Sequence, residues 1–323
     1  MDSDLIAILA SIMLQASPLM IAVCGETLTE RVGVVNLSLD GSMLLSAMTG
    51  FVAAYTSGSL LLGFLAAAAV GAIFALIVAF GSIQLKQSQV AIGFLLTLLG
   101  ADLSAFLGQN YTRLPGPYVS KLPIPVLSDI PIIGPIFFDQ DFVVYFALAL
   151  VIFTWWWLFH SQPGLQLRSV GERPEAAFAR GIATSRLRYI YVLVGGALVG
   201  VAGAAYSLDV KIGWRENHTL GFGWIALAIV IFGGWSPLRG AFGALLFGAT
   251  KALATILQRT YPEVSVVAFN ALPWLLMIAV LLLVSSRLNE RFEHRLPERL
   301  RRPVRRLFNV APPAALGREF RNQ

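Results

Sequence analysis

The residues of this 323-residue chain that are able to do covalent or metal chemistry are too scattered to form a recognisable motif. The three histidines, His160, His218 and His294, lie far apart, so their spacing gives no sign of a metal site. The single cysteine, Cys24, cannot form an intramolecular disulfide and is expected to pack in an apolar segment. Neither an HExxH nor a GxSxG pattern is present. We therefore expect no catalytic residue and no metal ligand in this chain.

The segment Gly243–Lys251, GALLFGATK, comes close to a phosphate-binding loop but fails on spacing. Such a loop places lysine directly after its second glycine, whereas Ala249 follows Gly248 here. Small residues instead recur every four positions, which lets membrane helices approach closely. This spacing occurs at Gly240, Ala244 and Gly248 and again at Gly196, Gly200 and Ala204. We interpret both sets as helix-packing faces, expect no cofactor in this chain, and assign Lys251 no role beyond snorkelling.

Four polar residues within or beside apolar segments are candidates for a translocation pathway, because polar groups there are costly and often functional. They are Asn36, Ser38, Asp40 and Asp102. Asp102 either faces such a pathway, where its carboxylate can accept hydrogen bonds, or stays hydrated near a membrane surface. The other three, in the sequence VVNLSLDG, either line the pathway or cap a helix, a position that Asn, Ser and Asp favour.

Nine apolar segments must position these residues. Hydrophobic residues make up 57% of the chain and charged residues only 13%, against about 25% in soluble domains. Uninterrupted apolar runs of about 20 residues, without the alternation of barrel strands, indicate membrane-spanning helices. The predicted spans are 5–25, 37–55, 59–82, 90–107, 142–160, 189–209, 222–235, 240–258 and 269–286, with a turn at Pro237 and Gly240 dividing the seventh from the eighth. The sequence thus predicts an all-α polytopic membrane domain, 1–286, and a basic cytoplasmic tail, 287–323.

The distribution of basic residues predicts that the N-terminus lies outside and the C-terminus in the cytoplasm, because cytoplasmic loops are enriched in Lys and Arg. In this orientation the inner loops contain Arg31, Lys86, Arg168, Arg173, Arg180, Arg186, Arg188 and Arg239. The outer loops contain Arg113, Lys121, Lys211, Arg215 and Arg259. The tail adds ten arginines against four acids, which favours an anchor to anionic lipid headgroups over a nucleic-acid site. The proline-rich outer loop 108–141 either caps the bundle or forms a docking surface for an external partner.

The polar stretch Val170–Ile190, VGERPEAAFARGIATSRLRYI, belongs to an inner connection, about 161–188, that is far longer than two neighbouring helices need. It carries a proline suited to a first helical turn, acids near the helix start, two helix-favouring alanines and a glycine able to end the helix. These residues are Glu172, Pro174, Glu175, Ala176, Ala177 and Gly181. The pattern predicts a short cytoplasmic helix with a face of small residues; the simplest alternative is a solvated surface loop.

Three segments carry a resemblance to a known family. Glu175-Ala176-Ala177-x-x-x-Gly181 resembles the EAA–glycine motif of the membrane subunits of ABC importers. The surrounding VGERPEAAFARGI is similar to the ribose and nucleoside branch of the permease family that also includes branched-chain amino acid permeases. The same branch is matched by ERVGVVNLSLDGSMLLSAMTGF at 30–51 and by IALAIVIFGGWSPLRGAFGALLFG at 225–248. The general motif continues to Ile-x-Leu-Pro, whereas Tyr-Val-Leu follows Ile190 here, so the resemblance does not fix where the helix ends.

The resemblance implies a permease subunit of a bacterial inner-membrane ABC importer for a nucleoside or simple sugar. The six residues of the short helix would then couple to a separate ABC ATPase subunit, which binds ATP and Mg, while an external binding protein delivers the substrate. The chain would pair with a second permease subunit, a related chain or a copy of itself, and 30–51 would lie beside the pathway. The alternatives are a branched-chain amino acid ABC permease and a self-contained secondary transporter. Paired broken helices would favour the secondary transporter, but the sequence shows one clear break, at 236–240.

Overall fold

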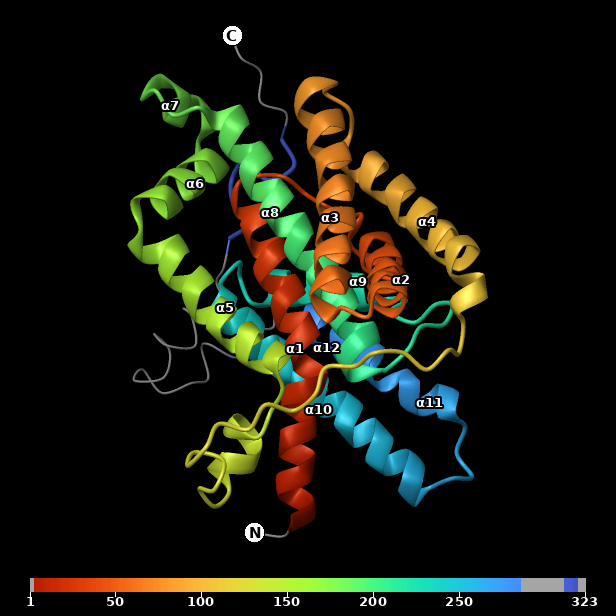
Figure 1. The fold of residues 1–323 in the computed structure, drawn as a ribbon. Helices are drawn as coiled ribbons and strands as arrows, with labels where there is room; N and C mark the ends of the chain where they lie inside the picture. The colour runs from red at the N-terminus through yellow and green to blue at the C-terminus, as the bar shows by residue number, and fades with distance from the viewer. Residues whose placement is uncertain (1–2, 286–310, 319–323) are drawn as a thin grey trace.

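The computed structural model describes residues 3–285 and 311–318, and those residues form a bundle of helices without a β-strand (Figure 1). An isolated antiparallel bridge pairs Lys121 with Asp141. The helices are α1 (Ser3–Arg31), α2 (Leu39–Ser57), α3 (Leu60–Ala79), η1 (Phe80–Gln84), α4 (Gln89–Gly108), η2 (Gln109–Tyr111), η3 (Gly134–Phe138), α5 (Phe142–His160), α6 (Gln162–Glu172), α7 (Pro174–Ala179), α8 (Thr184–Ala205), η4 (Tyr206–Val210), α9 (Phe222–Phe232), α10 (Pro237–Thr260), α11 (Val266–Asn270) and α12 (Leu272–Ser285). The expected all-α class is confirmed for the described part of the chain.

Six helical segments are long and apolar enough to cross a membrane. Within residues 3–285, each overlaps one of the nine predicted ranges, and all but Phe142–His160 extend beyond it: Leu5–Arg31, Leu60–Gln84, Gln89–Tyr111, Phe142–His160, Thr184–Val210 and Pro237–Thr260. The other three predicted ranges, 37–55, 222–235 and 269–286, contain α2, α9 and α12, which are not among these six segments. α9 has 11 residues and α12 has 14, both short of the roughly 20 that span a bilayer. The count of nine crossings therefore stays a prediction.

Helix α2 lies inside the bundle. Thirteen of its 19 residues are buried, and it packs against α3, α4 and α8. Ser42 and Ser46, in the first half of α2, are therefore enclosed by other helices. Ser46 Oγ donates a hydrogen bond to the Ala67 carbonyl of α3 at 3.2 Å. A polar side chain inside a membrane bundle is stabilised by such contacts between helices.

Small residues form the packing faces that their spacing predicts. A Cβ added at Gly200 would lie 2.1 Å from the Ala67 carbonyl oxygen, and one at Gly196 would lie 2.5 Å from that of Gly71, so α8 packs directly on the backbone of α3. The other set packs α10 on α1, since a Cβ at Gly248 would lie 2.7 Å from the Ile12 carbonyl oxygen. Both predictions of helix packing are confirmed.

The break between α9 and α10 lies where the sequence predicts it. α9 ends at Phe232 and α10 begins with Pro237. The connection itself turns at Gly234 and Trp235, whose φ values are +60° and +54°. Gly240, which was expected to mark the turn, instead lies in α10, where it packs against Val23.

The two ends of the bundle carry different structures. α6 and α7 lie at the end opposite the start of α1, while the loop that follows α4 and contains η3 lies near the start of α1 (Figure 1). This loop is tied to the chain after α8, because the Val119 N–H donates to the Leu208 carbonyl at 2.9 Å and the Arg113 N–H to the Trp214 carbonyl at 3.2 Å. The expected inner connection 161–188 and the expected outer loop 108–141 are thus at opposite ends.

Candidate functional site

The stretch that the sequence singled out forms two consecutive helices, α6 and α7. Pro174 is the first residue of α7, where its missing N–H costs no hydrogen bond. The helix ends after six residues, and Gly181 follows with φ +81°, donating its N–H to the Phe178 carbonyl at 2.8 Å. A positive φ suits glycine because it has no Cβ to clash with the backbone. The predicted short helix is present, with the predicted residues at its start and after its end.

The six candidate coupling residues divide into two groups by burial. Pro174 and Ala177 are buried against the rest of the chain, so they hold α7 in place. Glu172, Glu175, Ala176 and Gly181 are exposed. A Cβ added at Gly181 would meet no heavy atom within 4 Å among the described residues. Of the six candidates, only these four are accessible from outside the described chain.

Residues 311–318, here called the strap, join α6 to the connection between α1 and α2 (the blue segment near α6 and α8 in Figure 1). The Ala315 N–H donates to the Gly171 carbonyl at 2.9 Å, and the Gly317 N–H donates to the Gly33 carbonyl at 3.3 Å. The Ala314 N–H donates to Glu172 Oε2 at 3.3 Å. The strap thus binds a candidate coupling residue and fixes the end of α6.

The sequence did not predict the strap, because the ten arginines of 287–323 led us to interpret the whole stretch as a basic tail. The signal lay in APPAALG at 311–317, a short apolar run with two prolines inside a basic segment. Ala315 is buried, and Leu316 packs against the main hydrophobic core. The expected lipid anchor rests mostly on residues 287–310, which lie outside the described residues.

Asn36, Ser38 and Asp40 are brought together at the start of α2, and all three are buried. Asn36 Oδ1 accepts hydrogen bonds from the Ser38 N–H at 3.1 Å and from Ser38 Oγ at 2.6 Å. Asp40 Oδ1 accepts from the Gly223 N–H at 3.0 Å and so joins α2 to the start of α9. Asn36 and Ser38 bond each other before α2, but Ser38 at the N-cap position makes no side-chain hydrogen bond to the helix, whereas Asp40 makes a contact between helices.

Asp102 is not part of this group. The face of α4 that packs on α2 carries Thr97 and Ser104, whose hydroxyls donate to the Leu37 carbonyl at 2.7 Å and the Leu44 carbonyl at 3.1 Å. Asp102 lies on the exposed face of α4, beside Leu98 and Leu99, which are also exposed. Its role in a pathway therefore depends on what covers that face and stays a prediction.

A buried polar network at the end of α1 was not anticipated. The first span was expected to end at residue 25, but α1 continues to Arg31 and carries Glu30 into the interior. Trp235 Nε1 donates to Glu30 Oε2, and Arg31 Nε donates to the Trp235 carbonyl at 2.9 Å. This network fixes the connection between α9 and α10 on the end of α1, beside α6.

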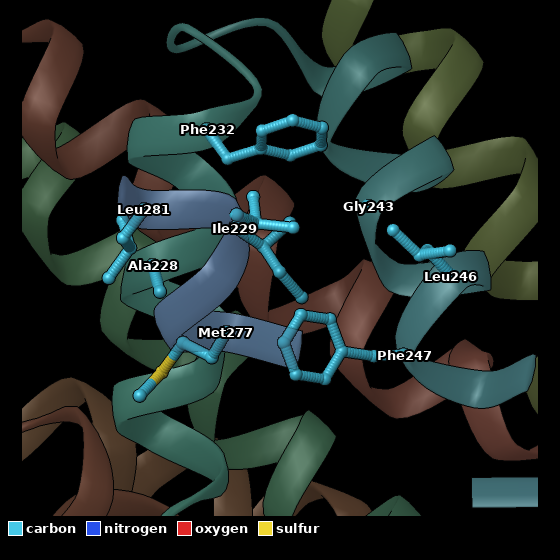
Figure 2. Close-up of a pocket in the computed structure, with 9 residues that line it drawn as sticks. Ala228, Ile229, Phe232, Gly243, Leu246, Phe247, Met277 and Leu281 are labelled. Carbon is cyan, nitrogen blue, oxygen red and sulfur yellow. The ribbon is translucent and has the colours of Figure 1, made fainter. Parts of the chain in front are cut away.

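The pocket between α9, α10 and α12 is apolar. Figure 2 shows Ile229, Phe232 and Phe247 around it, with Met277 on the facing helix. Its complete lining is Ala228, Ile229, Phe232, Gly243, Leu246, Phe247, Met277, Val280 and Leu281. A polar solute would lose its hydrogen bonds to water there without replacement, at a cost of several kcal/mol by a rough estimate. We therefore exclude this pocket as a site for a polar substrate.

Comparison with protein families gives a match over nearly the whole described bundle. The family described as "Branched-chain amino acid transport system / permease component" matches residues 8–284. This range includes the α1–α2 connection, the α6–α7 segment and the α9–α10 break. The strap lies beyond it.

Two relatives cover most of the chain. The Guanosine ABC transporter permease protein NupQ of Bacillus subtilis is 34% identical over 296 residues, which are 86% of this chain and 93% of that protein. A candidate glucose ABC transporter permease protein of Haloferax volcanii, TsgC13, is 38% identical over 242 residues, or 74% of each chain.

A solved structure shares the fold. It is an inward-facing conformation of a candidate metal-chelate type ABC transporter, with a TM-score of 0.50 and 17% sequence identity, over 86% of this chain and 85% of that one. At this identity the likeness concerns the arrangement of the helices and not the transported compound.

Proposed function

Since the chain belongs to the family of branched-chain amino acid transport system permease components, we propose that it is the membrane-spanning permease subunit of an ATP-driven ABC importer for a nucleoside or simple sugar. The observation that carries this proposal is the similarity to the guanosine permease NupQ, which extends over 93% of that protein. It also extends over 86% of this chain.

The proposed substrate class rests on the relatives. One is named for guanosine and another for glucose, and both compounds are neutral and carry several hydroxyl groups. A branched-chain amino acid, the alternative that the family description suggests, carries two charges and an apolar side chain. We favour the polyhydroxy compounds because both relatives, at 34% and 38% identity, are named for them.

The proposed coupling element is α7 with the end of α6. Glu172, Glu175, Ala176 and Gly181 would contact a groove on the ABC ATPase, while Pro174 and Ala177 position the helix. The exposure of the first four and the burial of the last two support this division. ATP and Mg would be bound and hydrolysed by that separate subunit. The motion would reach α1 through the contacts of α6 with Arg31 and the strap.

The proposed setting is the bacterial inner membrane, with the start of α1 outside and α6–α7 in the cytoplasm. The placement of α6–α7 and of the loop after α4 at opposite ends of the bundle supports this orientation (Figure 1). An external binding protein would dock near the loop 108–141. A second permease subunit, a related chain or a second copy, would complete the pathway, and Asp102 on the exposed face of α4 could then line it.

Reconstitution tests this proposal. The chain would be co-expressed with an ABC ATPase, a binding protein and a second permease subunit, purified, and placed in proteoliposomes with labelled guanosine, glucose and leucine. We expect uptake of guanosine or glucose that requires both ATP and the binding protein. Uptake of leucine alone would support the amino acid alternative. Uptake driven by an ion gradient without the ATPase would overturn the proposal in favour of a secondary transporter.

A further inference from the structure

A compact group of aromatic and cationic side chains lies where η4, α9 and α10 meet. The rings of Tyr206 and Phe222 make an edge-to-face contact, with their centroids 4.3 Å apart. Lys251 Nζ lies 3.7 Å from the centroid of Phe222 and 5.7 Å from that of Tyr206. Lys251, which the sequence left without a role, therefore points into the protein at this junction instead of snorkelling outward.

Buried hydrogen-bonding atoms without partners occur in this group and in the segment before α9, where Lys251 acts electrostatically on His218 and the Thr219 carbonyl accepts the Phe222 N–H. Tyr206 Oη, both ring nitrogens of His218 and Thr219 Oγ1 have no hydrogen-bond partner among the residues that the structure describes. These side chains are 0%, 6% and 0% exposed, respectively. Almost all buried polar groups in folded proteins are paired, so several unpaired atoms in one place require an explanation. A bound molecule that supplies their partners is one.

The charges around His218 define what the site offers a ligand. Burial and the nearby Lys211, Arg215 and Lys251 lower the pKa of His218 to about 3. The ring is therefore neutral at physiological pH, and it presents one N–H donor and one nitrogen acceptor. The hydroxyls of Tyr206 and Thr219 can each donate and accept. Lys251 adds donors, so the group offers a ligand both hydrogen-bond donors and acceptors.

We infer that Tyr206, His218, Thr219 and Lys251 form a substrate-binding site within the membrane domain for the hydroxyl groups of a sugar or a nucleoside ribose. The inference rests on the proposed function and extends it to particular residues. Sugar hydroxyls both donate and accept hydrogen bonds, so they match the unpaired atoms. The pocket of Figure 2 has an apolar lining and does not match sugar hydroxyls. Tyr206, His218 and Thr219 are buried here, so a substrate would reach them only when the surrounding helices separate.

The position of the site in the fold supports this assignment. Phe222 immediately precedes Gly223, whose N–H binds Asp40 on α2. The Phe222 N–H in turn donates to the Thr219 carbonyl at 3.0 Å. Thr219 of the proposed site and Asp40 of α2 thus both bind the first turn of α9, and Asp40 is one of the residues expected beside the pathway. A movement of α2 against α9 would change both together.

The test compares two tyrosines that each lose only a hydroxyl. Tyr206→Phe removes an unpaired buried group, so we expect unchanged or greater thermal stability together with about tenfold slower uptake, the change that the loss of one good hydrogen bond produces. Tyr145→Phe is the matched control. Its hydroxyl donates to the Phe138 carbonyl at 2.8 Å and accepts from the Gln140 N–H at 3.2 Å, so its loss should lower stability and leave uptake per folded complex unchanged.

The measurements use the whole reconstituted importer with saturating substrate-loaded binding protein. Substrate transported per ATP hydrolysed should fall for Tyr206→Phe and Thr219→Val, while stimulation of ATP hydrolysis by the binding protein is retained. With a series of deoxy analogues, at least one should be transported equally well by wild type and Tyr206→Phe. If both variants transport every compound as wild type does, water fills these positions and the inference is wrong. If wild type itself shows no ATP-dependent uptake, the proposed function has failed instead.

Discussion

The role of Asp40 depends on a hydrogen bond that only the folded chain can form. In the sequence it is a polar residue after a turn, and capping and pathway roles fit it equally well. In the structure its carboxylate accepts the Gly223 N–H from a segment 183 positions away. Its neighbours Asn36 and Ser38 satisfy each other within the turn, so only Asp40 links two helices.

Substitution of Asp40 separates its structural role from any role of its charge. Asp40→Leu leaves the Gly223 N–H buried without an acceptor, which should destabilise the protein by about 1–3 kcal/mol. Asp40→Asn keeps a carbonyl oxygen for this hydrogen bond. We expect a lower thermal unfolding temperature for the first variant and a nearly unchanged one for the second. If Asp40→Asn folds normally but loses uptake, the charge itself is needed in transport; if Asp40→Leu is as stable as wild type, the helix contact is unimportant.

At the scale of elements, the short helix α7 has one side buried against the protein and one side exposed. Pro174 and Ala177 face the protein, and Glu175 and Ala176 face away from it. The sequence motif combines the two groups because a helix alternates its faces within a few residues. Effects of substitution should therefore differ within the motif: buried positions should affect folding, and exposed positions should affect association.

Gly181 offers the sharpest test of α7 because a matched glycine exists elsewhere. Gly181 and Gly58 both have positive φ, +81° and +68°, and a Cβ at either meets no heavy atom within 4 Å among the described residues. Valine at either position should therefore carry a similar backbone cost of about 1–2 kcal/mol. We expect only Gly181→Val to weaken co-purification with the ATPase and to lower stimulated ATP turnover, by about fivefold if about 1 kcal/mol of docking energy is lost. An equal loss in Gly58→Val would attribute the effect to general strain.

The sequence predicted the elements better than the contacts between them. Long apolar runs and small-residue spacing located the helices and two packing faces, because both patterns are local. The length of α1 was underestimated: the predicted span ends at residue 25, whereas α1 continues through the buried Glu26 and Glu30, and Glu30 accepts a hydrogen bond from Trp235 of the α9–α10 connection. The unpaired group around His218 could not be predicted either. Its members come from positions 206, 218, 219 and 251, and only folding brings them together.

At the scale of the whole molecule, the orientation in the membrane is the prediction with the widest consequences. It places the binding protein near the loop after α4 and the ATPase near α7. The Lys121–Asp139 ion pair, with an N–O distance of 2.7 Å, lies in that loop and is partly exposed. An exposed pair of this kind contributes little to stability, so the loop can carry a reporter there.

Reporter fusions test the orientation. A reporter inserted near Lys121 should be active only outside the cytoplasm, and one fused after Gln323 only inside it. The excess of basic residues at the α6–α7 end is the physical reason. Activity of both reporters on the same side would contradict the proposed topology and, with it, the assignment of α7 to the cytoplasm.

The strap is tested by removing one of its N–H donors. Ala315→Pro eliminates the hydrogen bond to the Gly171 carbonyl and should release the end of α6. Ala311→Pro, in an exposed position of the same segment, is the control. We expect normal membrane insertion of both variants and weaker ATPase co-purification for Ala315→Pro alone. Equal association of both with the ATPase would show that α6 and α7 keep their places without the strap.

The place of the strap in the chain also sets an order of assembly. The ribosome synthesises every helix between residues 3 and 285 before it reaches residues 311–318. The hydrogen bonds from the strap to the end of α6 can therefore form only after those helices have been made. A growing chain can therefore complete its insertion into the bilayer while the surface beside α7 is still unfinished. A chain that ends before residue 311 would contain every helix described here but would lack the hydrogen bonds that the strap makes to Gly171 and Glu172.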